Sequence, residues 1–200
     1  MITNKSAALV ILFSLLSATA QAADSKGSFA LEGAGQASCS SFVDAVNTRS
    51  TDVVLFSGWL QGYLTGVNRY ESAVYDIATW PTQEQQLQFL LSVCRSNTGV
   101  RFFDAVGVMV DQLREYQLLE EEKLIVIGTL PNGAQLTLYP STIKLMRKRL
   151  NSLILADFSL PVSGVWDDEL EQVVLAYQQG TGLPATGLPD PDTLLRLFKD

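Results

Sequence analysis

The sequence predicts a mainly α-helical protein with three parts: a disulfide-tied N-terminal helical bundle, a short β-hairpin linker and a C-terminal three-helix module. Apolar residues recur at helical spacing along most of the chain, and the clearest stripe is Leu170, Val173, Val174 and Tyr177. Both cysteines, Cys39 and Cys94, lie before residue 100. A single segment, residues 124–139, shows a strand pattern around a Pro-Asn-Gly turn.

The first 22 residues have the pattern of a secretory signal peptide. Lys5 supplies a positive start, residues 7–16 an apolar stretch, and Ala20-Gln21-Ala22 a small-residue cleavage pattern. The apolar stretch is too short for a confident membrane span, and an uncleaved anchor is the alternative. We therefore expect residues 23–200 to be exported to the periplasm without a membrane span. Cleavage is expected near Ala22, after Ala20, Ala22 or Ala23.

The composition argues against several classes of function. The chain has 21 acidic and 14 basic residues and a formal net charge of −7, which disfavours nucleic acid because phosphate binding needs a basic face. It contains no histidine, so Ser-His-Asp and Cys-His catalysis and histidine-ligated zinc are excluded. Glycosidases need only carboxylates, but no pair of carboxylates stands out. We expect a non-catalytic protein without metal or cofactor.

The two cysteines predict one disulfide, Cys39–Cys94. An even pair in an exported chain favours this pairing, and closing such a loop stabilises a fold by roughly 4 kcal/mol on the chain-entropy model. A metal site is the alternative. Two thiols without histidine make a poor ligand set for it.

The N-terminal half is expected to hold a flexible lead-in, residues 23–36, and a helical domain, residues 37–122. The lead-in is small, polar and glycine-containing. Helices are predicted after a cap at Ser38 or Ser40, over residues 52–72, after a capping box formed by Thr82 and Gln85, and from Phe102 onward. The acidic run at residues 120–122 is expected to be solvated surface.

Three glycines at a spacing of four residues, Gly58, Gly62 and Gly66, lie inside the predicted helix at 52–72. Each costs about 1 kcal/mol relative to alanine, so we expect close approach of another helix to offset the cost. A tightly packed helix pair is one interpretation. The other is a groove or dimer surface lined by Trp59 and Tyr63. Polar residues in the segment argue against a membrane-spanning dimer motif.

The remaining chain is divided into a β-hairpin linker, residues 123–140, and a helical module, residues 141–200. Ser141 is predicted to cap the first helix of the module, Asp167 or Asp168 the second, and Asp190 the third. Gly180 and Gly182 can end the second helix.

An ordered set of residues in this module carries a family resemblance: Gly164, Trp166, Tyr177, Gln178, Gly182, Leu183, Thr186, Gly187 and Thr193. The set resembles the motif of the peptidoglycan-binding-like (PG_binding_1) domain family, which implies a module that associates with peptidoglycan. Turn and core roles are expected for Gly164, Gly182, Leu183, Gly187 and Leu197. The candidate peptidoglycan contacts are Trp166, Asp168, Tyr177, Gln178, Thr193, Arg147 and Lys148.

Each candidate contact also has a structural interpretation. The rings of Trp166 and Tyr177 can stack on a sugar or build the core of a small domain. Arg147 and Lys148 can meet wall-peptide carboxylates or form a solvated face. The three polar residues, Asp168, Gln178 and Thr193, can bind glycan or peptide, or cap helices.

The N-terminal domain carries two weaker resemblances. Cys39, Phe42, Cys94 and Phe103 resemble the pattern of HdeA-type periplasmic acid-stress proteins, in which two bridged cysteines hold a small helical bundle. The segment at residues 58–63 and the C-terminal module depart from that pattern. The Trp-x-x-Gly-Tyr sequence from Trp59 to Tyr63, between two cysteines, is also similar to small exported immunity proteins.

Together these features predict an exported, non-catalytic protein. We expect it to associate with peptidoglycan through residues 141–200 and to present the N-terminal helical domain to a periplasmic protein partner. The alternatives are an acid-stress-type periplasmic chaperone and an immunity or inhibitor protein directed against a wall-active enzyme.

Overall fold

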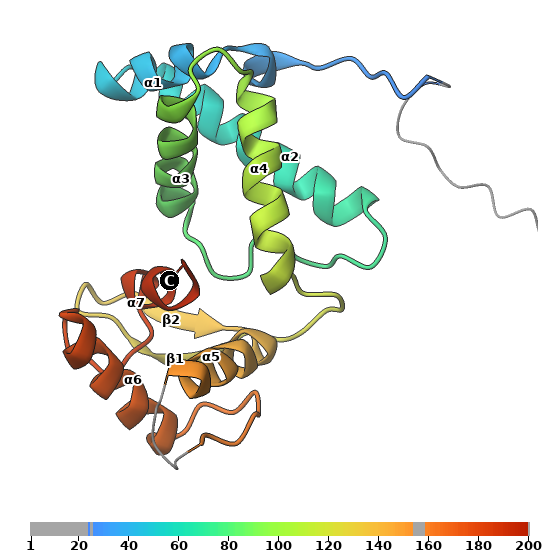
Figure 1. The fold of residues 1–200 in the computed structure, drawn as a ribbon. Coiled ribbons are helices and arrows are strands. Elements are labelled where there is room, and N and C mark those ends of the chain that lie inside the picture. Colours follow the sequence, from blue (N-terminus) through green and yellow to red (C-terminus); the bar gives the residue numbers. More distant parts are fainter. Residues whose placement is uncertain (1–23, 25, 154–158, 200) are drawn as a thin grey trace, which may run out of the picture. The chain divides into compact units, whose positions relative to one another are not determined.

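The computed structural model describes residues 24, 26–153 and 159–199 (Figure 1). The predicted signal peptide, residues 1–22, lies outside the described residues. The chain divides into two compact units, residues 1–31 and 32–200. In the first unit, the Asp24 carboxylate accepts hydrogen bonds at 2.8 Å from the backbone N–H groups of Lys26 and Ser28 and so closes a turn.

The second unit is built from helices and one hairpin, as predicted (Figure 1). Among the described residues its elements are η1 (Gly33–Gln36), α1 (Cys39–Asn47), α2 (Asp52–Tyr70), α3 (Gln83–Ser96), α4 (Phe102–Leu113), η2 (Arg114–Tyr116), β1 (Ile125–Thr129), β2 (Gln135–Leu138), α5 (Pro140–Leu153), α6 (Asp168–Thr181) and α7 (Pro191–Lys199). None of the described helices combines the length and apolar character that a membrane crossing requires.

Local capping chemistry sets where the bundle helices begin. Ser38, one of the two predicted caps, accepts a hydrogen bond from the backbone N–H of Ser41 and starts α1. Thr82 and Gln85 form the predicted reciprocal capping box of α3. Each cap satisfies backbone N–H groups that have no partner within the helix.

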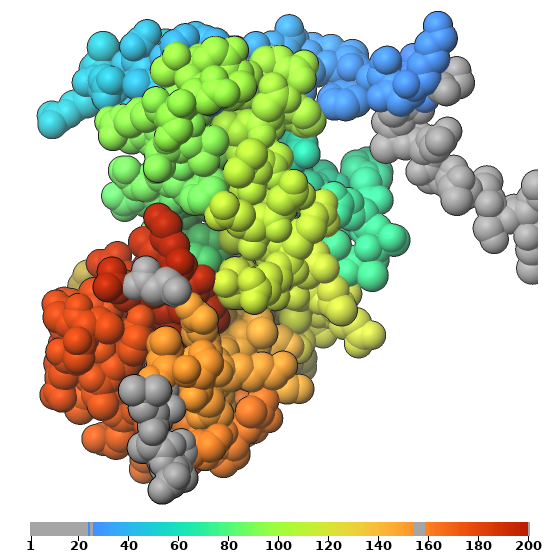
Figure 2. Space-filling view, in the orientation of Figure 1, coloured from blue at the N-terminus to red at the C-terminus, as the bar shows by residue number. Residues whose placement is uncertain are grey.

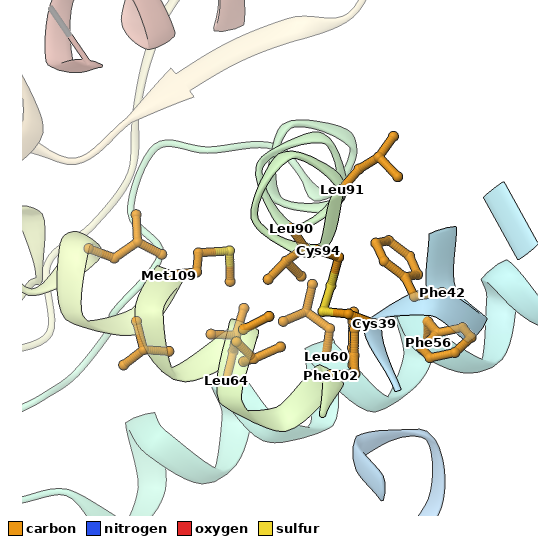
Figure 3. Packing of buried hydrophobic residues seen from close by; sticks show 14 of the residues in the cluster. Cys39, Phe42, Phe56, Leu60, Leu64, Leu90, Leu91, Cys94, Phe102 and Met109 are labelled. Carbon is orange, nitrogen blue, oxygen red and sulfur yellow. A yellow bond between two sulfur atoms is a disulfide. The ribbon is translucent and has the colours of Figure 1, made fainter. Parts of the chain in front are cut away.

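The bundle core is organised around the predicted disulfide between Cys39 of α1 and Cys94 of α3, which is confirmed. Both cysteines are fully buried. Beside them, the rings of Phe42, Phe56 and Phe102 contact one another with centroids 4.9–5.1 Å apart. Figure 3 shows these side chains converging from α1, α2, α3 and α4. The disulfide therefore joins two helices through the centre of the apolar core.

No helix of the described residues packs against the glycine stripe of α2, so that expectation is wrong. A Cβ atom added at Gly58, Gly62 or Gly66 would meet no described atom within 4 Å. The stripe lies on the outer face of α2, while Leu60 and Leu64 fill the core from its inner face. Burial on the inner face therefore has to offset the conformational cost of these glycines.

Residues 33–36, which belong to the predicted flexible lead-in, form η1 against α2. The indole nitrogen of Trp59 donates a 2.8 Å hydrogen bond to the backbone carbonyl of Glu32. A Cβ atom at Gly35 would lie 2.2 Å from the Trp59 ring, so only glycine fits there. Tyr63 stacks on the same ring at 5.3 Å. Trp59 is thus half-buried beneath Glu32 and η1.

The hairpin is part of the C-terminal core rather than a simple linker. Strands β1 and β2 pair antiparallel, with a register irregularity between Val126 and Gly128. Ile127, Leu136 and Leu138 pack into the same apolar cluster as the helices that follow. Strand β1 and the loop before α7 approach closely here, since a Cβ atom at Gly128 would lie 2.7 Å from the side chain of Leu188.

The acidic run at residues 120–122 contributes a helix cap. A carboxylate oxygen of Glu122 accepts a 2.9 Å hydrogen bond from the backbone N–H of Ser141, and the other carboxylate oxygen bonds the Ser141 hydroxyl. Helix α5 begins at Pro140, where the missing N–H of proline costs no helical hydrogen bond. The predicted cap at Ser141 is therefore wrong, because Ser141 is the second residue of α5 and its own backbone N–H is satisfied by Glu122.

The second apolar cluster joins the hairpin to α5, α6 and α7. Its fully or nearly buried helical members are Ile143, Met146, Leu150, Leu170, Val174, Leu194 and Leu197. Trp80 packs against both this cluster and the bundle core. The ring of Phe198 lies 5.4 Å from Trp80 and 4.9 Å from Tyr116, whose hydroxyl donates to the Phe198 carbonyl at 2.8 Å.

Candidate functional site

Close packing and a helix cap fix the loop from Gly164 to Asp167 and the start of α6. A Cβ atom at Gly164 would lie 2.8 Å from both the side chain and the carbonyl oxygen of Pro140, so the loop can pass α5 only with glycine. Asp167, one of the two predicted caps, starts α6 by accepting the Leu170 N–H at 2.9 Å. Asp168 follows it and is exposed.

Two glycines with positive φ close the other end of α6. Gly182 has a φ of +72° and forms the left-handed cap of the helix, as the glycine pattern predicts. Gly187 has a φ of +75°, and a Cβ atom there would meet Glu171 at 3.1 Å. Leu183 is half-buried between them, whereas Leu197 of α7 lies in the core. These positions serve backbone geometry and packing.

Gln178 is a fully buried hydrogen-bonding centre between α6, the following loop and α7. Its carbonyl oxygen accepts the backbone N–H groups of Thr186 at 3.0 Å and Gly187 at 2.8 Å. Its amide nitrogen donates to the Leu188 carbonyl at 2.8 Å and to the Thr193 hydroxyl at 2.9 Å. Gln178 and the buried Thr193 are both candidate peptidoglycan contacts, but their side chains bond to other residues inside the fold.

Arg147 is also a candidate contact that the structure places in the interior, with an exposed fraction of 0%. One terminal nitrogen of its guanidinium donates to the Val165 carbonyl at 2.9 Å and to the Asp167 carboxylate at 2.5 Å, and the other donates to the Pro161 carbonyl at 3.3 Å. The Leu170 N–H, and then Arg147, hold the pKa of the Asp167 carboxyl below its ordinary 3.8. The guanidinium thus fixes the loop before α6 and faces no solvent.

The other candidate contacts remain at the surface. Lys148 on α5 and Asp168 on α6 are exposed. Trp166 and Tyr177 are half-buried and pack against the second apolar cluster, so each ring combines a core contact with an accessible part. These four are the candidate residues that a bound polymer can still reach.

A groove that the sequence did not indicate lies between α3, the hairpin turn and α7. Its cavity volume is about 880 Å³. We call it the α3–α7 groove. It is lined by Thr82, Gln83, Glu84, Gln85, Gln88, Phe89, Leu130, Pro131, Asn132, Asp190, Pro191, Asp192, Leu195 and Lys199. No local pattern marks these residues, because they come from three segments that only the fold assembles.

The walls of the α3–α7 groove are fixed by hydrogen bonds. The Gln85 amide donates to the Pro191 carbonyl at 2.6 Å, which links α3 to the start of α7. Asp190 accepts the Thr193 N–H at 2.8 Å and so caps α7, as predicted. Asn132 accepts the Ala134 N–H at 3.0 Å in the hairpin turn. In Figure 2, α7, in red, lies against the green residues of α3.

The described residues contain no group of three or more histidine, cysteine, aspartate or glutamate side chains arranged to hold a metal ion. Both cysteines belong to the disulfide.

Comparison with known protein families matches the C-terminal region of the chain. Residues 140–197 match the family described as "Putative peptidoglycan binding domain". Comparison with curated proteins and with solved structures gives no match. The matched region runs from the first residue of α5 to Leu197 of α7 and leaves the hairpin and the bundle outside. The predicted resemblance to HdeA-type proteins is not confirmed. The C-terminal region of this chain, residues 140–197, thus matches the peptidoglycan-binding domain family, which supports its association with peptidoglycan.

Proposed function

We propose that this chain is an exported, non-catalytic protein that associates with peptidoglycan through residues 140–197 and presents its disulfide-tied bundle to a periplasmic protein partner. The family match of residues 140–197 is the observation that carries this proposal. Export rests on the signal pattern of the first 22 residues. A non-catalytic role rests on the lack of histidine and of any paired carboxylates in the sequence pattern.

The proposal assigns polymer contact to the accessible candidates Trp166, Tyr177, Asp168 and Lys148. An aromatic ring that is partly exposed can stack on the apolar face of a sugar. Lys148 can pair with a carboxylate of the wall polymer. Gln178, Thr193 and Arg147 support the surface from inside.

The bundle supplies the protein-facing surface. Val54 and Leu55 at the start of α2 are 72% and 64% exposed, and Tyr70 at its end is 77% exposed. Between them, the three glycines of the stripe carry no side chains, and no described residue covers this outer face of α2. Exposed apolar side chains beside such a face favour contact with another protein.

The test of wall association is co-sedimentation with purified insoluble sacculi. Residues 23–200, oxidised and at physiological salt, should pellet with sacculi and stay in solution without them. Trp166→Ala should reduce the pelleted fraction, whereas Val165→Ala, which changes an exposed neighbour, should not. Thermal melting of both variants separates lost binding from lost folding. If the wild-type chain does not pellet with sacculi, association with peptidoglycan is disproved.

The test of the bundle's role uses the same preparation. Leu55→Glu places a charge on the outer face of α2 without touching the core. The wild-type chain should cross-link to an envelope protein, and the Leu55→Glu variant should not. Both proteins should pellet with sacculi to the same extent. Equal cross-linking by both proteins would remove α2 as the interaction surface.

A further inference from the structure

The α3–α7 groove combines side chains of opposite charge with amide and apolar side chains. Carboxylates line it from both walls, with Glu84 on α3 and Asp192 on α7. Lys199, at the end of α7, supplies a cation. The amides of Gln88 and Asn132 and the ring of Phe89 also line it. This mixture suits a chain that carries amide bonds and charges of both signs.

The charged groups are available for a ligand. Within the part of the chain that the structure describes, the side chains of Glu84, Asp192 and Lys199 make no hydrogen bond or ion pair to another described residue. By contrast, Asp190 is used as the cap of α7. Three of the charges that line the groove therefore have no internal partner.

The spacing of the charges sets the size of the ligand. Asp192 and Lys199 are seven positions apart on α7, which corresponds to about 10 Å along the helix axis at 1.5 Å per residue. An extended peptide covers that length in about three residues. A short peptide can therefore place an ammonium group near the carboxylates and its carboxylate near Lys199.

We propose that the α3–α7 groove binds peptide stems of the wall polymer that carry a free primary amine. This inference rests on the proposed function, since the family match makes peptidoglycan the polymer in question. Its stems are short peptides that contain a diamino acid. Cross-linking converts the side-chain amine of that residue into a neutral amide. The groove therefore distinguishes uncross-linked stems from cross-linked ones.

The acidic residues also have a local role that does not explain the whole groove. Glu84 and Asp192 lie in the first turns of α3 and α7, where a negative charge favours the helix dipole. That role requires neither the lysine nor the amides and the aromatic ring that gather in the same hollow. Glu169 is also an exposed acidic residue in the first turn of a helix, α6, and it lies outside the groove. It provides a matched control.

The experiment measures binding of residues 23–200 to two soluble disaccharide-tetrapeptides by calorimetry. One has a free amine on its diamino acid, and in the other that amine is acetylated. The wild-type chain should bind the free-amine probe about tenfold more tightly, as expected when two surface charge pairs are lost together. The double variant Glu84→Gln/Asp192→Asn should bind both probes equally, and Glu169→Gln should behave as wild type. Matching melting temperatures show that the variants are folded.

Each outcome decides between the proposals. Equal binding of the two probes by the wild-type chain, or full discrimination by the double variant, overturns the groove inference. If this happens while the chain still pellets with sacculi, wall association stands and its contacts lie elsewhere. If the chain does not pellet at all, the proposed function fails as well.

Discussion

The carboxylate of Asp167 joins a buried charge to a helix start. One of its oxygens lies 2.5 Å from the fully buried guanidinium of Arg147, and the other accepts the Leu170 N–H that begins α6. The side chain of Asp167 itself is 42% exposed. One residue thus neutralises the interior cation of α5 and caps the next helix.

Asp167→Asn tests this pair. Asparagine remains a good helix cap, so the change mainly leaves the Arg147 charge without its counterion. We expect the free energy of unfolding to fall by about 2 kcal/mol, less than for a fully buried pair because water reaches Asp167. Asp168→Asn, at the exposed neighbouring position, should change it by less than about 0.5 kcal/mol. Urea denaturation of both variants gives the comparison, and equal stabilities would remove the ion pair as a structural element.

Gln178→Leu removes the hydrogen-bonding centre of the C-terminal module. The leucine fills similar space but leaves the N–H groups of Thr186 and Gly187 and the hydroxyl of Thr193 without this partner. We expect a loss of about 3 kcal/mol in the free energy of unfolding. Gln179→Leu is the control, because Gln179 is exposed on the same helix. Hydrogen exchange should show faster exchange at Thr186 and Gly187 in the first variant alone.

Reduction of the Cys39–Cys94 disulfide should destabilise the bundle. The two cysteines are 55 residues apart, and releasing a loop of this length costs roughly 4 kcal/mol on the chain-entropy model. A reducing agent should therefore lower the unfolding midpoint of the wild-type protein. The double variant Cys39→Ala/Cys94→Ala should be insensitive to the agent. A thiol assay that finds two free groups in the unfolded, unreduced protein would contradict the bridge.

Alanine at two glycines should have opposite effects on stability. At Gly35 the new Cβ atom would lie 2.2 Å from the Trp59 ring, so η1 or Trp59 has to move and the protein should become less stable. At Gly62, in the open face of α2, the Cβ atom meets nothing within 4 Å. Gly62→Ala should stabilise the protein by up to about 1 kcal/mol, since alanine is the better helix former. The unfolding midpoints in urea show whether each variant is more or less stable than the wild type. A loss of stability in Gly62→Ala would mean that the outer face of α2 packs against another part of the protein.

The ion pair between Glu71 and Arg114 should make the bundle sensitive to acid. Their closest approach is 2.7 Å, and the hydrogen bonds from Arg114 hold the pKa of Glu71 below its ordinary 4.5. A carboxyl whose pKa is lowered by folding stabilises the fold above its ordinary pKa and loses that contribution as pH falls through the lowered value. The stability difference between wild type and Glu71→Gln should therefore shrink below pH 4.5. In an Arg114→Gln background the pH dependence of that difference should be much weaker, and an unchanged dependence would exclude this pair as its cause.

Local sequence patterns were sufficient for most helices and the hairpin, although they missed η1 within the predicted lead-in. The Thr82–Gln85 capping box, the Asp190-Pro191 start of α7 and the positive φ of Gly182 depend on neighbouring residues only. The Cys39–Cys94 bridge followed from the cysteine count and the predicted export, and the ordered motif around Tyr177 and Gly187 indicated the family that residues 140–197 match. Short-range backbone chemistry and one covalent pairing therefore determined the helices, the hairpin and the C-terminal family.

Only the tertiary structure decided which side chains face solvent. Arg147 and Lys148 are adjacent in the sequence, yet one is fully buried and the other exposed, because Asp167 and two loop carbonyls surround the first. The glycine stripe of α2 faces outward because no described residue covers it. The α3–α7 groove brings Glu84 and Asp192 together from helices about a hundred residues apart. Burial and juxtaposition depend on long-range packing, which no local pattern in a single sequence records.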